Sequence, residues 1–211
     1  MASFADLAQS VIEGKEDQVK DQVKGLLAAG TSPVSIINDG LIAGMNVVGQ
    51  RFKVGDMYVP EVLMSARSMS AGLEIVRPLI ADTDMKSAGK VVLGTVKGDL
   101  HDIGKNLVGM MMESGGLEVI NLGVDVSADK FIDAIYEHKP DILAMSALLT
   151  TTMPGMKDTI ELLEEEGLRD KVKVIVGGAP VSKDFAQSIG ADGYAPDAAS
   201  ATELCKALIG A

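Results

Sequence analysis

The sequence predicts an α/β protein: an N-terminal four-helix bundle followed by a doubly wound domain with a five-stranded parallel sheet. Up to residue 80, apolar residues recur only at the helical spacing of three and four. From residue 90 onward, short runs of Val, Ile and Leu alternate with helical patterns, which is typical of a parallel sheet covered on both faces. The stretch between them is mostly polar or small and carries no period. We therefore expect a helical domain over residues 1–81, a linker over 82–89 and an α/β domain over 90–211.

Four amphipathic helices account for the first domain. Their apolar stripes cover residues 4–11, 19–27, 34–52 and 62–80. Thr31, Ser32 and Pro33 mark the start of the third helix, because a hydroxyl side chain can cap free backbone amides and proline suits the first helical position. Pro60 opens the fourth helix in the same way. Short connections between these helices predict a small bundle.

Five strands account for the second domain. They are expected over residues 90–96, 117–122, 141–146, 171–176 and 193–194, with helical patterns in the gaps and a last helix from about residue 197. This alternation fits a flavodoxin-like domain, and a strand order of 2-1-3-4-5 would place a crevice between the carboxyl ends of the first and third strands. The loops at 98–106 and 146–152 would then meet in that crevice.

The composition argues against several classes of partner. The formal net charge of −11 repels phosphate backbones and anionic lipids, so we expect neither nucleic acid nor a membrane surface as a partner. No apolar run approaches the roughly 20 residues that a bilayer span requires, and the N-terminus lacks the features of a signal peptide, so the prediction is a cytoplasmic protein. The single cysteine, Cys205, permits no internal disulfide and is expected in the core.

The loop after the first strand contains His101, one of only two histidines in the chain. Three common kinds of site do not fit this loop. A phosphate-binding loop would need glycine and Ser/Thr where the chain has Asp99 and Asn106, and the glycines of a dinucleotide fingerprint are missing. A structural zinc site is excluded because one cysteine and two distant histidines cannot supply four ligands. Nucleophilic hydrolysis lacks a recognisable pair of nucleophile and base.

A lone histidine can still bind a metal that brings its other ligands in a macrocycle. One ring nitrogen would face the metal, while the other needs an acceptor that sets the tautomer and strengthens the imidazole as a donor. Asp99, two residues before His101, is placed to be that acceptor, and the hydroxyl side chains at 150–152 could extend the relay. Haem is one candidate macrocycle, but its usual pocket is rich in aromatic residues, which make up only 3% of this chain.

Three motifs of the chain resemble the DxHxxG, SxL and GG signature of cobalamin-binding domains. They are Asp99-x-His101-x-x-Gly104, Ser146-x-Leu148 and Gly177-Gly178. The chain as a whole resembles the stand-alone corrinoid proteins of anaerobic methyltransferase systems and the cobalamin-binding region of methionine synthase. This resemblance implies that the cofactor is cobalamin or a related corrinoid, with methylcobalamin in the loaded state. It also implies that His101 ligates the cobalt in place of the lower benzimidazole.

The resemblance further implies roles for individual residues. Asp99 would support His101, and Thr152 would take the third relay position, where methionine synthase has a serine. The residues implied to bind the cofactor beside His101 are Asp102, Ile103 and Gly104, and those implied to line a slot for its nucleotide tail are Ser146, Leu148, Thr150, Gly177 and Gly178. In the helical cap, Phe52, Val59 and Val62 would shield the upper, methyl-bearing face.

The function implied by the resemblance is that of a methyl carrier, a component of a multi-protein system and not a complete enzyme alone. One methyltransferase would supply the methyl group from an aryl methyl ether, a methylamine or a quaternary amine. A second methyltransferase would pass it to tetrahydrofolate or coenzyme M, and a reductive activase would be a further partner. Closeness to acetogen-type carriers favours ether demethylation and tetrahydrofolate. A hinge is expected near 81–89, because a shielded methyl group cannot be attacked.

Two other functions share these motifs. A B12-dependent sensor or regulator could have both the cap and the cobalamin domain, but it would normally carry an output domain. The small subunit of an adenosylcobalamin mutase shares the sheet motifs, although its radical chemistry needs no helical cap. The upper ligand separates them, since methyl or water favours the carrier and adenosyl favours the others.

Overall fold

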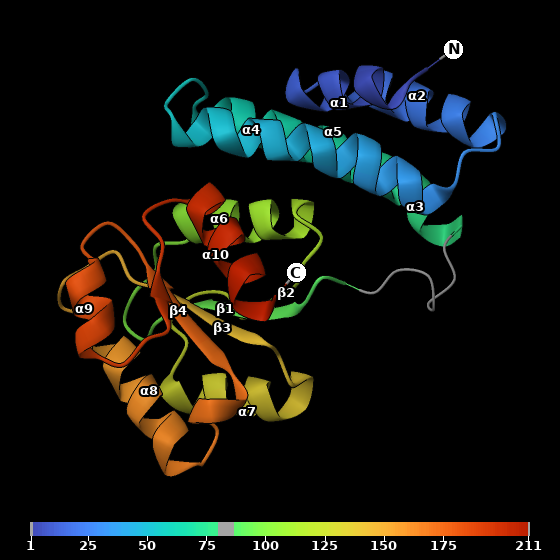
Figure 1. Cartoon of the computed structure of the whole chain (residues 1–211). Coiled ribbons are helices and arrows are strands. Elements are labelled where there is room, and N and C mark those ends of the chain that lie inside the picture. The colour runs from blue at the N-terminus through green and yellow to red at the C-terminus, as the bar shows by residue number, and fades with distance from the viewer. Residues whose placement is uncertain (1, 80–86, 211) are drawn as a thin grey trace. The chain divides into compact units, whose positions relative to one another are not determined.

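The structure is a computed structural model that describes residues 2–79 and 87–210. The chain divides into two compact units, Met1–Lys86 with Ser114–Gly116, and Ser87–Glu113 with Leu117–Ala211. The first unit is helical and the second is an α/β unit (Figure 1). Most of the stretch in which we expect the linker and hinge, 80–86, lies outside the described residues.

The helical unit follows the predicted apolar stripes. Its elements are α1 (Phe4–Ile12), α2 (Glu16–Ala28), α3 (Pro33–Ser35), the π-helical η1 (Ile36–Ile42), α4 (Ala43–Lys53), α5 (Val59–Val76) and the 3-10 turn η2 (Arg77–Leu79). α3, η1 and α4 form one continuous run, so the third predicted helix is present with a π-helical middle. The apolar stripes form the core of this unit, in which Leu7, Val19 and Leu41 are fully buried.

The starts of the third and fourth helices differ from the prediction in detail. Ser32 precedes α3 but its hydroxyl makes no capping bond, so the predicted hydroxyl cap is wrong, whereas Pro33 does occupy the first position. At α5 the start is Val59, one residue before the expected proline. There the Glu61 carboxylate accepts a hydrogen bond from the Tyr58 amide at 2.8 Å, which satisfies a backbone donor that the helix leaves free.

Within the described residues of the α/β unit, five parallel strands form one sheet. They are β1 (Lys90–Thr95), β2 (Glu118–Asn121), β3 (Ile142–Ser146), β4 (Lys173–Gly177) and β5 (Gly193–Tyr194). Their spatial order is β2-β1-β3-β4-β5, which confirms the predicted order. Thr95 lies in register with Ser146, and Ser146 with Gly177, so the carboxyl ends of three neighbouring strands meet at one edge.

Helices cover both faces of this sheet (Figure 1). They are α6 (Ile103–Ser114), α7 (Ala128–His138), α8 (Pro154–Glu165), α9 (Lys183–Ser188) and α10 (Ala198–Ile209), with a 3-10 turn η3 (Arg169–Lys171) before β4. α7, α8 and α9 pack on one face around Phe131 and Met156. α6 and α10 pack on the other face around Met112 and Cys205. Cys205 is fully buried, as predicted, and burial raises the pKa of its thiol to about 12. No helix in the described part of the chain combines the length and the apolar character that a bilayer crossing requires.

Asp192 ties the turn before β5 to neighbouring elements. Its carboxylate accepts hydrogen bonds from the Val174 amide at 2.7 Å and from the Arg169 guanidinium at 2.8 Å. Burial acts to raise the pKa of Asp192, but these bonds and the nearby positive charges outweigh it, so the pKa lies below the ordinary value of 3.8. The ionised carboxylate therefore stabilises the folded state.

This lowered pKa predicts a specific sensitivity to acid. A carboxyl group with a lower pKa in the folded state contributes stability above its unfolded pKa, and that stability is lost as the pH falls through the folded value. We expect the free energy of unfolding to fall more steeply from pH 5 to pH 2 in the wild type than in Asp192→Asn. Urea unfolding across this range measures the difference. The same dependence of the free energy of unfolding on pH in the two proteins would contradict the prediction.

Candidate functional site

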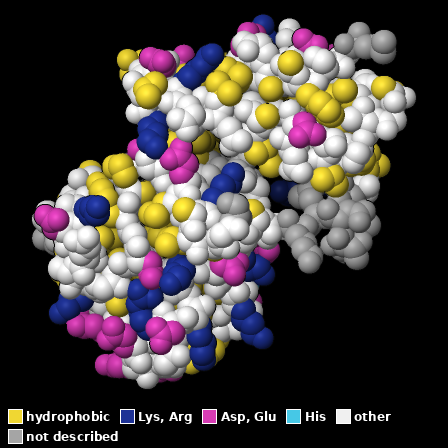
Figure 2. Space-filling model, in the orientation of Figure 1, with side chains coloured by type: hydrophobic (Ala, Val, Ile, Leu, Met, Phe, Trp, Pro, Cys, Tyr) yellow, Lys and Arg dark blue, Asp and Glu magenta, His cyan; other side chains and the backbone are white. Residues whose placement is uncertain are grey.

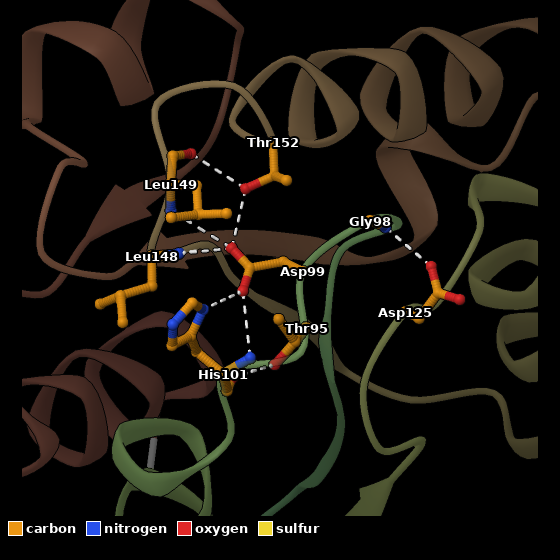
Figure 3. Close-up of polar contacts among 8 residues, drawn as sticks. All are labelled: Thr95, Gly98, Asp99, His101, Asp125, Leu148, Leu149 and Thr152. Atoms are coloured by element: carbon orange, nitrogen blue, oxygen red, sulfur yellow. Dashed lines mark hydrogen bonds and ion pairs between the residues drawn. The ribbon is translucent and has the colours of Figure 1, made fainter.

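The loop between β1 and α6 presents His101 at the carboxyl edge of the sheet (Figure 3). Gly98 has φ of +81°, a conformation that glycine adopts without strain, and the Asp99 amide then donates to the Val96 carbonyl at 3.1 Å. The hydroxyl of Thr95, the last residue of β1, donates to the His101 carbonyl at 3.0 Å. The loop is thus a tight turn whose backbone is held to the end of the strand. The His101 side chain remains 51% exposed.

Asp99 is the buried centre of the polar contacts in this loop. One carboxylate oxygen lies 2.7 Å from Nδ1 of His101 and also accepts from the His101 amide at 3.1 Å. The other oxygen accepts from the Thr152 hydroxyl at 2.8 Å, from the Leu148 amide at 2.7 Å and from the Leu149 amide at 3.3 Å. The side chain of Asp99 is fully buried, so these bonds replace water as its partners. His101 and the loop after β3 therefore share one carboxylate.

The surroundings of Asp99 keep it ionised. Burial acts to raise its pKa, but the bonds from Leu148, Thr152 and His101 stabilise the charged form more strongly and hold the pKa well below its ordinary value. An ionised carboxylate can only accept, so Nδ1 of His101 must carry the proton of the bond between them. In the neutral imidazole this leaves the lone pair on Nε2, the nitrogen that Asp99 does not bind. The exposed ring is thereby prepared to bind a metal through Nε2.

Exposed apolar side chains lie close to this polar pair in the chain or in contact with it through their backbone. They are Leu100 (70% exposed) in the loop after β1, Ile103 (78%) at the start of α6, and Leu148 (41%) and Leu149 (41%) in the loop after β3. In Figure 3 the Leu148 side chain lies beside the imidazole of His101. Exposed apolar side chains near an exposed imidazole are typical of a binding site for a largely apolar molecule. A metal in a flat macrocycle fits this donor set, because the protein supplies one imidazole in an apolar setting.

The ends of β3 and β4 place the second and third sequence motifs next to each other. Ser146 and Gly177 are half-buried and lie in register. Gly178 follows with φ of +126°, and a Cβ atom at this position would lie 1.9 Å from the carbonyl oxygen of Ala147. Only glycine allows the two chain segments to approach so closely. Thr150 is exposed in the turn that follows β3.

The remaining predicted residues lie in two places. Asp102 and Gly104 are exposed at the start of α6, where the Asp102 carboxylate accepts from the Asn106 side chain at 3.1 Å. Phe52 and Val59 are half-buried in the helical unit, at the end of α4 and the start of α5. Val62 in α5 is fully buried. The proposed shielding role of these three cap residues stays a prediction.

The helical unit also exposes apolar side chains that the sequence did not single out. Figure 2 shows hydrophobic side chains on the visible face of both units. Among the exposed residues, Val54 (69%) and Tyr58 (70%) belong to the connection between α4 and α5, next to Phe52 and Val59.

Two residues outside the His101 loop hold it in place, and the sequence did not single them out. Thr95 holds the His101 carbonyl, and Asp125, in the loop after β2, accepts from the Gly98 amide at 2.7 Å. A signal for Asp125 did exist. It follows a predicted strand at the same carboxyl edge, and aspartate tolerates the left-handed conformation of tight turns better than most residues.

The hydroxyl of Thr152 is open to a direct test. We expect Thr152→Val to lower the free energy of unfolding by about 1–2 kcal/mol, because the valine cannot donate to the buried Asp99 carboxylate. Thr152→Ser keeps the donor and serves as the matched control. Urea unfolding of the two variants measures the difference. Equal stability of Thr152→Val and the wild type would contradict the importance of this bond.

The comparisons with known proteins agree with these features. Residues 89–203 and residues 4–77 each match a family model described as a B12 binding domain. The chain is 45% identical over 213 residues to a corrinoid protein of Desulfitobacterium hafniense strain Y51, covering 100% of this chain and 99% of that protein. It is 46% identical over 208 residues to the dimethylamine corrinoid protein of Methanosarcina barkeri, covering 97% and 96% of the two chains.

A solved structure supports the fold at similar coverage. The crystal structure of the methanol:cobalamin methyltransferase complex MtaBC from Methanosarcina barkeri contains a chain that is similar with a TM-score of 0.86 and 36% identity. The match covers 97% of the present chain and 78% of that one. Both units of the structure are therefore represented in a protein of known fold.

Proposed function

The chain belongs to the family of B12-binding corrinoid proteins, and on this basis we propose that it carries a methyl group on a bound corrinoid between two methyltransferases. One observation carries the proposal. The buried, ionised Asp99 holds the proton of His101 on Nδ1 and leaves Nε2 available in an exposed apolar setting. This is the arrangement that a protein ligand to the cobalt of a corrin ring requires.

Each residue of this site would have a separate role in holding the corrinoid. When bound, the corrinoid supplies a cobalt ion that can accept a methyl group and give it up. His101 would hold the cobalt through Nε2. Asp99 would keep the proton on Nδ1 and fix the orientation of the imidazole ring. Thr152 in turn holds Asp99 by its hydroxyl. Leu148 and Ile103 would cover the lower face of the ring and exclude water from it.

The rest of the site follows from the positions of the other motifs. Asp102 and Gly104 would contact the corrinoid at the start of α6. The residues proposed to line a slot for the nucleotide tail are Ser146, Leu148, Thr150, Gly177 and Gly178. We also propose residues 1–81 as the cap, 82–89 as the linker with the hinge, and 90–211 as the corrinoid-binding domain. Phe52, Val59 and Val62 would then protect the upper face until the cap moves.

The partners follow from the carrier role. A substrate-specific methyltransferase would load the methyl group, a second would pass it to tetrahydrofolate or coenzyme M, and a reductive activase would restore the cobalt. The relative named for dimethylamine and the complex named for methanol add to the range of donors worth testing. Methylated amines are the first donors to test because the dimethylamine relative is the more similar of these two. Aryl methyl ethers, quaternary amines and tetrahydrofolate as the acceptor stay predictions.

Transfer of a labelled methyl group tests the proposal. The protein is loaded with hydroxocobalamin, reduced, and mixed with a methylated amine carrying ¹⁴C in its methyl group together with the matching methyltransferase. We expect label to move to the corrinoid protein, with a change in its absorption spectrum, and then to an acceptor when the second methyltransferase is added. Failure to take up label from amine, ether or quaternary amine donors would contradict the carrier role. An adenosyl group found as the natural upper ligand would favour a mutase or a sensor instead.

A further inference from the structure

We infer that Asp125, in the loop between β2 and α7, is a positioning residue for the cobalt-binding His101. The inference rests on the proposed corrinoid-binding function and adds a residue outside the three sequence motifs. Asp125 lies on the β2 side of the loop, opposite the contacts that Asp99 makes with the end of β3 (Figure 3). It acts on His101 through the backbone of Gly98 and Asp99.

Two hydrogen bonds join Asp125 to the His101 loop. The Asp125 carboxylate accepts from the Gly98 amide at 2.7 Å, and the Asp125 amide donates to the Asp99 carbonyl at 3.1 Å. The two bonds clamp adjacent residues of the turn from one side chain and one backbone group. Because the first bond has an ionised acceptor, it belongs to the stronger class of hydrogen bonds. The clamp therefore restrains the backbone from which the Asp99 side chain extends.

The backbone conformation of Asp125 supports a specific role. Among the described residues other than glycine, only Asp125 and Lys139 have a positive φ, +53° and +48°. Lys139 directly follows α7, a position where a left-handed residue is common. Asp125 ends no helix, and a left-handed conformation persists in such a residue where surrounding contacts favour it. Its two bonds to Gly98 and Asp99 are those contacts.

The two Asp125 bonds affect the position of the His101 imidazole through Asp99. Asp99 contacts Nδ1 of His101 at 2.7 Å with one oxygen and the loop after β3 with the other. The Asp99 carboxylate can reach both His101 and the loop after β3 only if the backbone of Asp99 stays in position. Asp125 holds that backbone from the β2 side, and the Thr95 hydroxyl at the end of β1 donates to the His101 carbonyl. Loss of the Asp125 acceptor should thus loosen the turn and let the Asp99–His101 bond vary in direction.

Three substitutions at Asp125 distinguish the effect of losing the side-chain acceptor from the effect of a residue that resists the positive φ. Asp125→Asn keeps an oxygen acceptor and tolerates a positive φ. Asp125→Ala removes the acceptor and resists this φ. Asp125→Gly removes the acceptor but adopts the conformation freely. Thermal unfolding establishes that each variant is folded, which is expected because Asp125 is exposed.

Two readouts that do not depend on methyl transfer test the inference. We expect the Gly98 amide of the cofactor-free protein to exchange with deuterium roughly tenfold faster in the Ala and Gly variants, as loss of a charge-assisted hydrogen bond implies. After loading with hydroxocobalamin, both variants should show a smaller histidine-bound fraction in their absorption spectra. Asp125→Asn should resemble the wild type in both measurements.

Two kinds of result would overturn the inference. Wild-type exchange at Gly98 or an unchanged spectrum in Asp125→Ala or Asp125→Gly would mean that the clamp does not position His101. A loss in Asp125→Asn as large as that in Asp125→Ala would mean that the oxygen acceptor is not the operative group. These results are independent of the methyl-transfer test, because they require neither a donor nor a methyltransferase.

Discussion

Replacement of His101 by alanine is expected to abolish the histidine-bound absorption spectrum of the hydroxocobalamin-loaded protein and to weaken corrinoid binding about tenfold or more. The imidazole is the one protein donor that the site offers to cobalt in our proposal, and Asp99 already holds it in the required tautomer. The fold should survive, since the His101 side chain is half-exposed. Spectroscopic titration of the cofactor-free variant with hydroxocobalamin measures both effects.

The second histidine provides a matched control. His138 ends α7, in a separate part of the α/β unit from the loop after β1, and His138→Ala should leave the spectrum and the affinity unchanged. Free imidazole added to the His101→Ala variant should restore a nitrogen-ligated spectrum, because it can occupy the position of the lost ring. Tight binding by His101→Ala with the wild-type spectrum would show that another group binds the cobalt.

Replacement of Gly178 by alanine is expected to cost roughly 3 kcal/mol or more of the free energy of unfolding. Two independent terms contribute. The backbone has φ of +126°, which is strained for any residue with a side chain, and the new methyl group would lie 1.9 Å from the carbonyl oxygen of Ala147. The end of β4 would have to move away from the end of β3. Since Ser146 and Gly177 lie in register there, we also expect corrinoid binding to be lost.

Gly104→Ala is the matched control for this substitution. A Cβ atom at Gly104 would meet no atom within 4 Å, and alanine favours helices more than glycine does. We therefore expect Gly104→Ala to keep or slightly raise the free energy of unfolding. Urea unfolding of the two cofactor-free variants measures the contrast. A wild-type unfolding midpoint for Gly178→Ala would contradict the structural reason given for this glycine.

Much of the fold could be predicted because its signals are local. The spacing of apolar residues distinguishes a helix such as α5 from a strand such as β3 without reference to the rest of the chain. The strand order also followed, since strands separated by helices pack in few ways. The hydroxyl cap at Ser32 and the π-helical η1 did not follow, because both depend on small differences in backbone geometry that packing decides.

The candidate site divides in the same way. Asp99 and His101 are two residues apart, so their contact could be inferred from the sequence. The bond between Asp99 and Thr152 spans 53 residues. The predicted strand order brought the hydroxyl side chains at 150–152 near the His101 loop, but only the resemblance to a known family selected Thr152 among them. Asp125 is 27 residues from Gly98 and belongs to no motif, so nothing local connected the two.

The sequence by itself determined the elements and their parallel order, and it singled out His101 as the proposed ligand, because periodicity and short motifs are properties of neighbouring residues. Only the tertiary structure decided how the loop that carries this histidine is held in place. The carboxyl ends of β1, β2 and β3 meet at one edge, and this meeting buries Asp99 among donors from the loop after β3 and brings Asp125 to the opposite side of the turn. Contacts of this kind depend on the packing of distant segments, which no local pattern encodes.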